Sequence, residues 1–334
     1  MINELEVGKA YACTLALLEC TKQKTKAGKD FLRLVFTDGQ EQVVGNYWDW
    51  AGGDRLPPVN NVYIVTCNVS EWNGTKQLNV SKMELNKTTD LNSFRPRVGP
   101  AEFVEEYYNR ALSLIDDINN EVLKLICHEV YTSLKDAWLT LPAAKGVHHA
   151  YVAGNLIHSV NVATLAGNMA TVLHADVDLC IAGGLLHDVG KLLTYTWDGI
   201  RIDMTPYGQL TDHIILGNNL LSSVCQSVGA PSGIEMLLTH VVLSHHGKKE
   251  WGSPVEPKCI EALIVHNADA LDANIECIRA ASKPGEAWTG KIFTLNNTSF
   301  MTEDLVSALL DLRLEEVTWQ DDVAECMKQE PSII

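Results

Sequence analysis

The sequence contains no paired-cysteine motif, no signal-peptide pattern and no apolar run that stands out as a membrane span. No Cys-x-x-Cys occurs among the nine cysteines, which excludes a zinc knuckle and a thioredoxin-like redox pair. The cysteines are scattered through apolar contexts, as is typical of reduced, buried thiols. The N-terminal stretch MINELEVGKAYAC lacks the charged and apolar blocks of a signal peptide. We therefore expect a cytoplasmic protein that does not enter a membrane.

The sequence also lacks an excess of basic residues, since 42 Asp and Glu outnumber 26 Lys and Arg, for a net charge of −16. This balance argues against a protein that simply coats nucleic acid. The imbalance lies in one part of the chain. Residues 1–97 hold 12 basic and 11 acidic residues, whereas residues 98–334 hold 14 and 31. The acidic part either concentrates divalent cations or only favours solubility.

Short runs rich in β-branched and aromatic residues fill the first part of the chain, up to about residue 88. Five of them begin near Tyr11, Phe31, Gln42, Val62 and Gln77, with turn signals rich in Gly, Asn and Asp between them. Five short strands in fewer than 90 residues predict a small barrel, for which an OB-fold is the leading candidate and an SH3-like barrel the alternative.

Residues 89–100 interrupt this pattern with two prolines and several polar residues, which predicts a linker. From residue 101 onward, apolar residues such as Phe103 and Tyr107 recur at helical spacing. Further helices are predicted near 121–135, 152–173, 177–193, 211–228, 232–245, 258–280 and 303–312. Thr211 and Asp212 are expected to cap the helix that contains His213.

The predicted fold is therefore multidomain, with α and β parts. It has an OB-fold at 1–88, a linker at 89–100, an all-α domain at 101–300 and a helical tail at 301–334.

Histidine and aspartate recur through the helical part in the order His, His-Asp, His, His-His, Asp. Imidazole and carboxylate are ligand types suited to Mn²⁺, Fe²⁺, Zn²⁺ or Ni²⁺. A single histidine on an apolar helix is more often a core residue, but every member of this set falls on a predicted helix or its edge. We therefore predict metal ligands at His158, His187, Asp188, His213, His245, His246 and Asp269.

Asp188 is expected to join these ligands into two neighbouring sites, because adjacent helical residues point about 100° apart. The first ion would be bound by His158, His187, Asp188 and Asp269, and the second by Asp188, His213, His245 and His246. Two ions about 3.5–4 Å apart would bind a phosphate and generate a hydroxide nucleophile. Asp272, three residues after Asp269, is expected to support the site or to cap a helix.

The ligands lie within longer motifs that can be quoted as they stand. These are Pro142-Ala-Ala-Lys-Gly-Val-His-His-Ala-Tyr, Gly184-Leu-Leu-His-Asp-Val-Gly-Lys, Leu243-Ser-His-His-Gly-Lys, Trp251-Gly-Ser-Pro and Glu261-Ala-Leu-Ile-Val-His-Asn-Ala-Asp. Together with the order of a β part and a helical part, they resemble the YhaM-type 3′→5′ exoribonucleases of the HD superfamily. The resemblance covers about residues 1–295. Asn155 and Ile157 depart from it, because the family usually has Leu and Glu there.

This resemblance implies an OB-fold followed by an HD-domain phosphohydrolase. It implies trimming of single-stranded RNA or DNA from the 3′ end, by a protein that assembles as a homo-oligomer. It also implies two divalent ions, with Mn²⁺ favoured over Mg²⁺, Fe²⁺, Co²⁺, Ni²⁺ or Zn²⁺.

Catalytic roles are expected for Asp188, Lys191, His149 and Lys145. A lysine beside the metal ions would pair with a non-bridging phosphate oxygen as a point charge. His149 would donate a proton to the leaving 3′-oxygen as a general acid. The alternative is that these residues are capping or solvated lysines and a packed histidine.

The predicted barrel carries candidates for holding a single strand, which basic grooves and aromatic faces bind. They are Lys22, Lys24, Lys26, Lys29, Arg33, Trp48, Trp50 and Trp72. The alternative is that the tryptophans fill the barrel core and the lysines solvate an edge strand.

Three functions are compatible with these features. The first is a metal-dependent 3′→5′ exonuclease. The second is an HD-type phosphohydrolase that acts on nucleotides or cyclic dinucleotides, which would need no OB-fold. The third is a nucleic-acid-binding module without activity, against which the complete ligand set argues.

Overall fold

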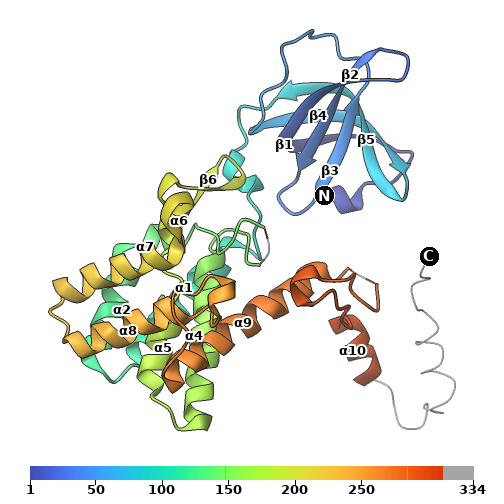
Figure 1. Cartoon of the computed structure of the whole chain (residues 1–334). Helices are drawn as coiled ribbons and strands as arrows, with labels where there is room; N and C mark the ends of the chain where they lie inside the picture. Colours follow the sequence, from blue (N-terminus) through green and yellow to red (C-terminus); the bar gives the residue numbers. More distant parts are fainter. Residues whose placement is uncertain (147, 284, 311–334) are drawn as a thin grey trace, which may run out of the picture. The chain divides into compact units, whose positions relative to one another are not determined.

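The computed structural model describes residues 1–146, 148–283 and 285–310 (Figure 1). A larger unit runs from the N-terminus to Asp272 and contains both the β part and most of the helices. A smaller unit begins at Ala273.

A closed five-stranded barrel forms the N-terminal part, as expected (Figure 1). A 3₁₀ turn at Ile2–Glu4 precedes the strands β1 (Ala10–Lys24), β2 (Asp30–Thr37), β3 (Gln42–Tyr47), β4 (Asn61–Trp72) and β5 (Thr75–Leu85). The strand order is β1-β2-β3-β5-β4, and β1 pairs with β4 to close the barrel. All pairs are antiparallel except β3 with β5. This barrel is OB-like, so the SH3-like alternative is excluded.

The length of β1 explains how so short a barrel closes. Its first half pairs with β4 and its second half with β2, and the register shifts between Leu17 and Glu19. Such a bulge bends a strand and increases its twist, which allows one strand to belong to both sides of a barrel. Alternate side chains, among them Leu15, Leu32 and Leu78, are fully buried in the barrel core.

The predicted linker is packed against the barrel rather than extended in solvent. It contains a 3₁₀ turn at Leu91–Phe94, capped by the side chain of Asp90. Phe94 is buried in a small cluster with Ala16, Leu18 and Val62 of the barrel.

The helices of the second part pack around a shared apolar core. They are α1 (Ala101–Asp116), α2 (Glu121–Ser133), α3 (Lys135–Trp138), α4 (Gly154–Leu173), α5 (Val177–Leu186), α6 (Lys191–Thr194), α7 (Pro206–Ser227), α8 (Ser232–Ser244) and α9 (Ile260–Ala281). Asn120 caps α2, Asp176 caps α5 and Thr205 caps α7 through side-chain oxygens. In the core, Tyr131 stacks on Trp138 with ring centroids 4.4 Å apart.

Helix α4 corrects the expectation that no apolar run is long enough for a membrane span. By length and composition α4 would qualify, with a mean hydropathy of 1.3 over its most apolar window. That window is 56% buried inside the protein, and α4 carries the fully buried Asn155 and His158. A central helix with apolar neighbours on most sides has no wide polar face, so its hydropathy resembles that of a span.

The helix expected at 177–193 was too long, because α5 ends at Leu186. The second part is helical, as predicted, with one unpredicted addition, a hairpin formed by β6 (Tyr195–Asp198) and β7 (Arg201–Met204). The hairpin had a signal in the sequence. Asp198-Gly199 is a turn dipeptide, and Gly199 adopts the positive φ of 61° that glycine tolerates.

The smaller unit contains a 3₁₀ turn at Phe293–Leu295 and the helix α10 (Glu303–Leu310). Two isolated antiparallel bridges join Trp288 to Met301 and Ile292 to Thr298. The last two residues of the helix predicted at 303–312, and the rest of the predicted tail up to residue 334, lie outside the described residues.

Candidate metal centre

Asp188 lies in the turn that follows α5, between His187 at the C-cap and Gly190. A Cβ added at Gly190 would lie 1.9 Å from the carbonyl oxygen of His213 and 2.5 Å from the amide nitrogen of Gly217. Only glycine therefore allows this turn to touch the backbone of α7. The close approach brings Asp188 beside His213, which is 25 residues further along the chain.

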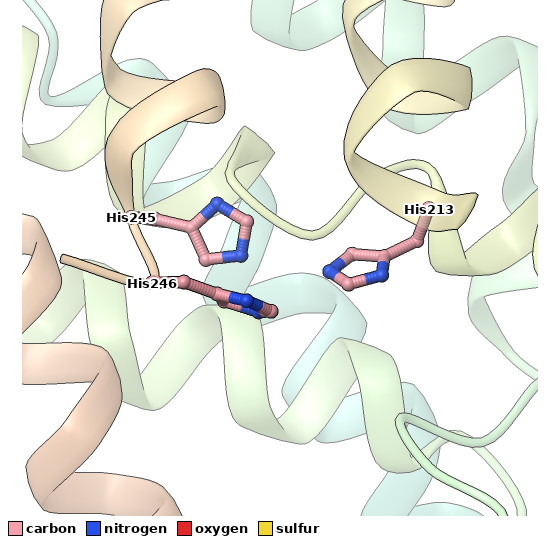
Figure 2. Close-up of side chains that lie close together, drawn as sticks. All are labelled: His213, His245 and His246. Atoms are coloured by element: carbon pink, nitrogen blue, oxygen red, sulfur yellow. The ribbon is translucent and has the colours of Figure 1, made fainter. Parts of the chain in front are cut away.

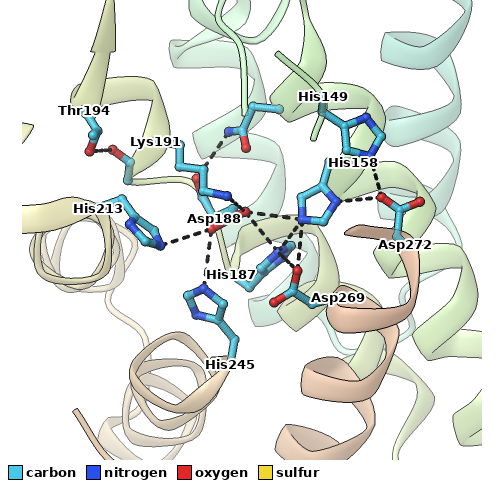
Figure 3. Close-up of polar contacts among 12 residues, drawn as sticks. His149, His158, His187, Asp188, Lys191, Thr194, His213, His245, Asp269 and Asp272 are labelled. Atoms are coloured by element: carbon cyan, nitrogen blue, oxygen red, sulfur yellow. Dashed lines mark hydrogen bonds and ion pairs between the residues drawn. The ribbon is translucent and has the colours of Figure 1, made fainter. Parts of the chain in front are cut away.

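The two carboxylate oxygens of Asp188 face two different groups of histidines (Figure 3). Oδ2 lies 3.3 Å from Nε2 of His158 and 3.3 Å from Nε2 of His187. Oδ1 lies 3.5 Å from Nε2 of His213 and 3.4 Å from Nε2 of His245. This is the arrangement that a carboxylate needs if it is to bridge two ions.

Asp269 and His246 complete the two groups. Oδ1 of Asp269, on α9, lies 3.2 Å from Nε2 of His158. The His246 ring lies 4.5 Å from that of His245 and 5.2 Å from that of His213, centroid to centroid (Figure 2). In each group, one possible ligand atom per residue lies within 4.8 Å of the others. The structure thus brings all seven predicted ligands together.

The outer nitrogens of the histidines are bound to protein acceptors. Nδ1 of His187 donates to the carbonyl of Gly184 at 2.8 Å, and Nδ1 of His245 donates to that of Val242 at 2.7 Å. Nδ1 of His246 likewise donates to the carbonyl of Trp251, at 3.0 Å. A carbonyl can only accept, so Nδ1 carries the hydrogen and the lone pair remains on Nε2. This tautomer is the one that metal-ligating histidines adopt.

The other two histidines are oriented by carboxylates. Nδ1 of His158 lies 2.7 Å from Oδ2 of Asp272, and Nδ1 of His213 contacts the carboxylate of Asp212. Asp212 itself has φ 65° and ψ 158°, which splits α7 into two helical segments. Asp212 therefore begins the helical segment that contains His213, as predicted. The whole of α7 begins earlier, at Pro206.

Several atoms that point into the centre have no hydrogen-bond partner within the described part of the protein. Oδ1 of Asp188 and Nε2 of both His213 and His245 are buried without a hydrogen bond. Unsatisfied buried polar atoms are rare and costly, so a cluster of them is suited to hold an ion. Carboxylate oxygens and imidazole lone pairs that converge in this way fit divalent cations.

Electrostatics favour the ligating forms of Asp188, His245 and His246, but not that of His158. Burial lowers the pKa of His245 and of His246, so both rings are neutral at pH 7. Burial also opposes the ionisation of Asp188, but Lys191 and His187 hold the pKa of this carboxyl well below its usual range. At His158 burial opposes protonation, yet Asp188, Asp269 and Asp272 raise the pKa well above its usual range. A proton therefore competes with a metal ion at His158.

The four catalytic candidates lie in different surroundings. Asp188 is central, and the buried Lys191 places Nζ 2.6 Å from its Oδ2. Lys145 is not brought to the cluster, because its exposed ammonium pairs with Oδ1 of Asp203 at 3.0 Å. His149 is buried, and its Nδ1 lies 2.6 Å from the hydroxyl of Tyr151.

His149 also contacts Asp272, at 2.7 Å from Nε2 to Oδ2. Both ring nitrogens of His149 thus contact protein groups, which favours a role for His149 in positioning Asp272. The general-acid role stays a prediction.

Asparagines beside the centre were missed by the sequence analysis. Nδ2 of Asn161 donates to Oδ1 of Asp272 at 2.9 Å, and Nδ2 of Asn155 donates to the backbone carbonyl of Asp188 at 3.2 Å. Asn155 is one of the two residues that depart from the pattern of the resembling family, and its amide nitrogen finds its acceptor at the centre itself. A signal existed for Asn161, which follows His158 by three positions and so shares its helix face.

Two of the predicted strand-binding lysines of the barrel are paired with aspartates. Lys22 pairs with Asp54 at 2.8 Å and with Asp30 at 3.1 Å, and Lys29 pairs with Asp49 at 2.6 Å. Lys24 and Lys26 are exposed and Arg33 is half-buried.

The tryptophans of the barrel differ in exposure. Trp50 packs against the barrel core, as the alternative reading held. Trp48 is 40% exposed and stacks on Phe31 with ring centroids 4.5 Å apart, and Trp72 is 67% exposed at the β4–β5 turn.

Comparison with known proteins agrees with this geometry. Residues 155–274 match the family model of the HD domain, and this range encloses all seven candidate ligands and Asp272. The chain therefore contains an HD domain, which follows an OB-like barrel.

Two similar solved structures are of the HD domain of the L. monocytogenes phosphodiesterase PgpH. One is 18% identical, with 59% of this chain and 92% of that chain covered and a TM-score of 0.29. The other, a complex with cyclic-di-AMP, is 20% identical, with 55% and 88% covered and a TM-score of 0.30. Similarity this low supports no inference about the substrate.

Proposed function

We propose that this protein is a metal-dependent phosphohydrolase that cleaves phosphodiester bonds, and that it trims single-stranded RNA or DNA from the 3′ end. The observation that carries the proposal is the buried carboxylate of Asp188, whose two oxygens face two separate groups of imidazole nitrogens. Such a bridged pair of divalent cations, when bound, polarises a phosphate and supplies hydroxide near neutral pH.

The residues around Asp188 have distinct tasks in this proposal. The histidines and Asp269 hold the cations in place, while Asp272 and Asp212 fix the orientation of two of the rings. Lys191 is buried next to Asp188, so its ammonium can move to a non-bridging phosphate oxygen once cations neutralise that carboxylate. This exchange keeps the buried charge paired both with and without substrate.

The identity of the ions follows from the donor set only in part. Mixed imidazole and carboxylate donors suit Mn²⁺, Fe²⁺, Co²⁺, Ni²⁺ and Zn²⁺, while Mg²⁺ prefers oxygen alone. We propose Mn²⁺, on the family resemblance described above.

An exonuclease also needs to hold the strand upstream of the cleaved bond. OB-like barrels bind single strands through stacking platforms, and two tryptophans of this barrel, Trp48 and Trp72, are exposed enough to stack. The family resemblance supports the 3′→5′ direction and a homo-oligomer, and the scattered free cysteines support a cytoplasmic location.

A second candidate is hydrolysis of nucleotides or cyclic dinucleotides. It is favoured by the ion pairs of Lys22 and Lys29, which leave the barrel with less free positive charge than a strand-binding groove needs.

A degradation time course separates the two candidates. The full-length protein is incubated with Mn²⁺ and 5′-labelled single strands of RNA and DNA of equal sequence, and products are resolved by length. A ladder that shortens by single nucleotides is expected from the wild type, none from Asp188→Ala, and an unchanged ladder from the exposed control Asp304→Ala. Intact strands with the wild type, together with hydrolysis of a cyclic dinucleotide, would overturn the exonuclease in favour of the second candidate.

A further inference from the structure

An exposed tryptophan lies directly beside the metal-ligand candidate His246. Trp251 ends the 3₁₀ turn at Lys249–Trp251, and its backbone carbonyl accepts the hydrogen of His246 Nδ1 at 3.0 Å. Its side chain is nevertheless 54% exposed, whereas Trp138 in the same domain is fully buried. An aromatic ring that is exposed to solvent next to a candidate active centre is accessible to a bound ligand.

The segment that carries Trp251 is held firmly on both sides. The hydroxyl of Ser253 lies 2.7 Å from the carbonyl oxygen of Val255 and 3.1 Å from that of Leu243. Gly247 has φ 79°, and a Cβ there would lie 2.3 Å from the ring of His266, which itself bonds the carbonyl of His245 at 2.7 Å. Trp251 is therefore exposed on an ordered loop. The same backbone that carries Trp251 also orients His246.

The surroundings of the ring are basic, although its domain is acidic. Lys248 places Nζ 4.6 Å from the centre of the Trp251 ring, and Lys248 and Lys249 are both exposed. Glu250 pairs loosely with Lys248, at 3.6 Å. The segment thus joins a flat aromatic face to positive charge in the part of the chain that holds 14 basic and 31 acidic residues.

We propose that Trp251 stacks on the base of the 3′-terminal nucleotide, and that Lys249 faces the backbone of the same strand. A flat aromatic face with neighbouring cations is the combination that single-stranded nucleic acid recognises, since every base has a π-face and every linkage a negative charge. The proposal rests on the phosphohydrolase function proposed above and names the terminal base as the group recognised. Trp251 is thus a specificity-determining residue, outside the set that holds the ions.

Binding of matched oligonucleotides to the full-length protein tests this role. In EDTA, where no cleavage occurs, affinity is measured for a fluorescent single strand with its normal 3′-terminal base and for one whose terminal nucleotide is abasic. A third strand carries the abasic nucleotide at the sixth position from the 3′ end. We expect the wild type to lose roughly 5- to 100-fold in affinity on removal of the terminal base, as stacking on an aromatic residue predicts.

Three variants locate the effect. Trp251→Ala is expected to bind the normal and the terminally abasic strand equally, while Trp251→Phe keeps most of the difference because it keeps an aromatic face. Trp288→Ala, at another exposed tryptophan, should leave the terminal-base effect unchanged. Trp251→Ala that still distinguishes the two strands as the wild type does would overturn the proposal, and so would an equal effect of the abasic nucleotide at the sixth position.

Failure of the proposed function has a different signature. A wild type that trims no strand with Mn²⁺ contradicts the exonuclease itself. A wild type that trims, but shows no dependence on the terminal base, contradicts only the role of Trp251. The metal content of purified Trp251→Phe serves as a second readout, because a retained carbonyl contact to His246 predicts the content of the wild type.

Discussion

The barrel and the HD domain differ in how the structure arranges the residues that were predicted to be functional. In the HD domain the other six candidates, from three helices and two turns, converge on Asp188, and the outer nitrogens of the histidines are already bonded so that the inner ones face each other. In the barrel the eight candidates divide into two lysines paired with aspartates, two other exposed lysines, a half-buried arginine, a packed tryptophan and two exposed tryptophans. Metal coordination demands one narrow geometry, whereas single-strand binding can use many surfaces.

The largest expected effect is the loss of the bridging carboxylate. Asp188→Ala removes a ligand from both proposed ions and leaves Lys191 buried without its partner. We expect hydrolysis to fall by roughly a thousandfold or more, beyond the 10–100-fold that is typical of a supporting residue. Metal content is measured by mass spectrometry alongside activity. A variant that keeps two ions per chain would contradict the bridging role of Asp188.

A tenfold to hundredfold effect is expected from Asp272→Asn. This change weakens the contact that orients His158, but it removes no ligand. Loss of such partners commonly lowers metal affinity by about 10–100-fold. Titration of the metal-free protein with Mn²⁺ gives the affinity, and Asp304→Asn, on the exposed face of α10, is the matched control. Equal affinities for the two variants would show that Asp272 does not position His158.

The barrel prediction is smaller and tests the other half of the comparison. If Trp72 stacks on a base, Trp72→Ala should weaken binding of a single strand by about fivefold, the lower end of the effect for one stacked ring. Trp50→Phe should leave binding unchanged, because that ring packs against the barrel core. Fluorescence anisotropy at fixed salt measures both. Binding that is unchanged by Trp72→Ala would leave the barrel without a role for that ring.

The smallest effect concerns the stability of the barrel and its dependence on pH. The side chain of Asp38 accepts the backbone N–H groups of Ile2, Gln40 and Glu41. Burial opposes its ionisation, but these bonds hold the pKa of Asp38 below its usual range. Hydrogen bonds to a charged group contribute about 1.5–3 kcal/mol each, so Asp38→Asn should lower the free energy of unfolding by an amount of that order at pH 7.

The sign of the pH dependence follows from the lowered pKa of Asp38. The folded state holds its proton less tightly than the unfolded state, so the stabilisation is complete above the unfolded pKa of about 3.9. It is lost as the pH falls through the lower, folded pKa. Urea unfolding from pH 7 down to pH 3 should therefore show the wild type and Asp38→Asn converging in acid. A constant difference would exclude Asp38 as the source.

Much of the fold could be predicted from the sequence, because the patterns that indicate strands, helices and turns are local. The five strands and most helices appear where alternation, helical spacing and turn residues predicted them, and the order of the His and Asp residues indicated the centre before its geometry was known. The hairpin at 195–204 was not predicted. The helix predicted to begin near 211 is the second segment of a longer helix that is kinked at Asp212. Both depend on how short segments pack, which outweighs their weak local preference.

By itself the sequence determined which side chains can bind metal ions, because imidazole and carboxylate chemistry belongs to the residue type. Only the tertiary structure decided how they are used. It turned one oxygen of Asp188 to each group, and it gave every histidine an outer acceptor. It also paired Lys22 and Lys29 of the barrel with aspartates and left Trp251 in solvent. The reason is physical. A donor atom acts through distance and burial, and both are set by contacts between segments that lie far apart in the chain.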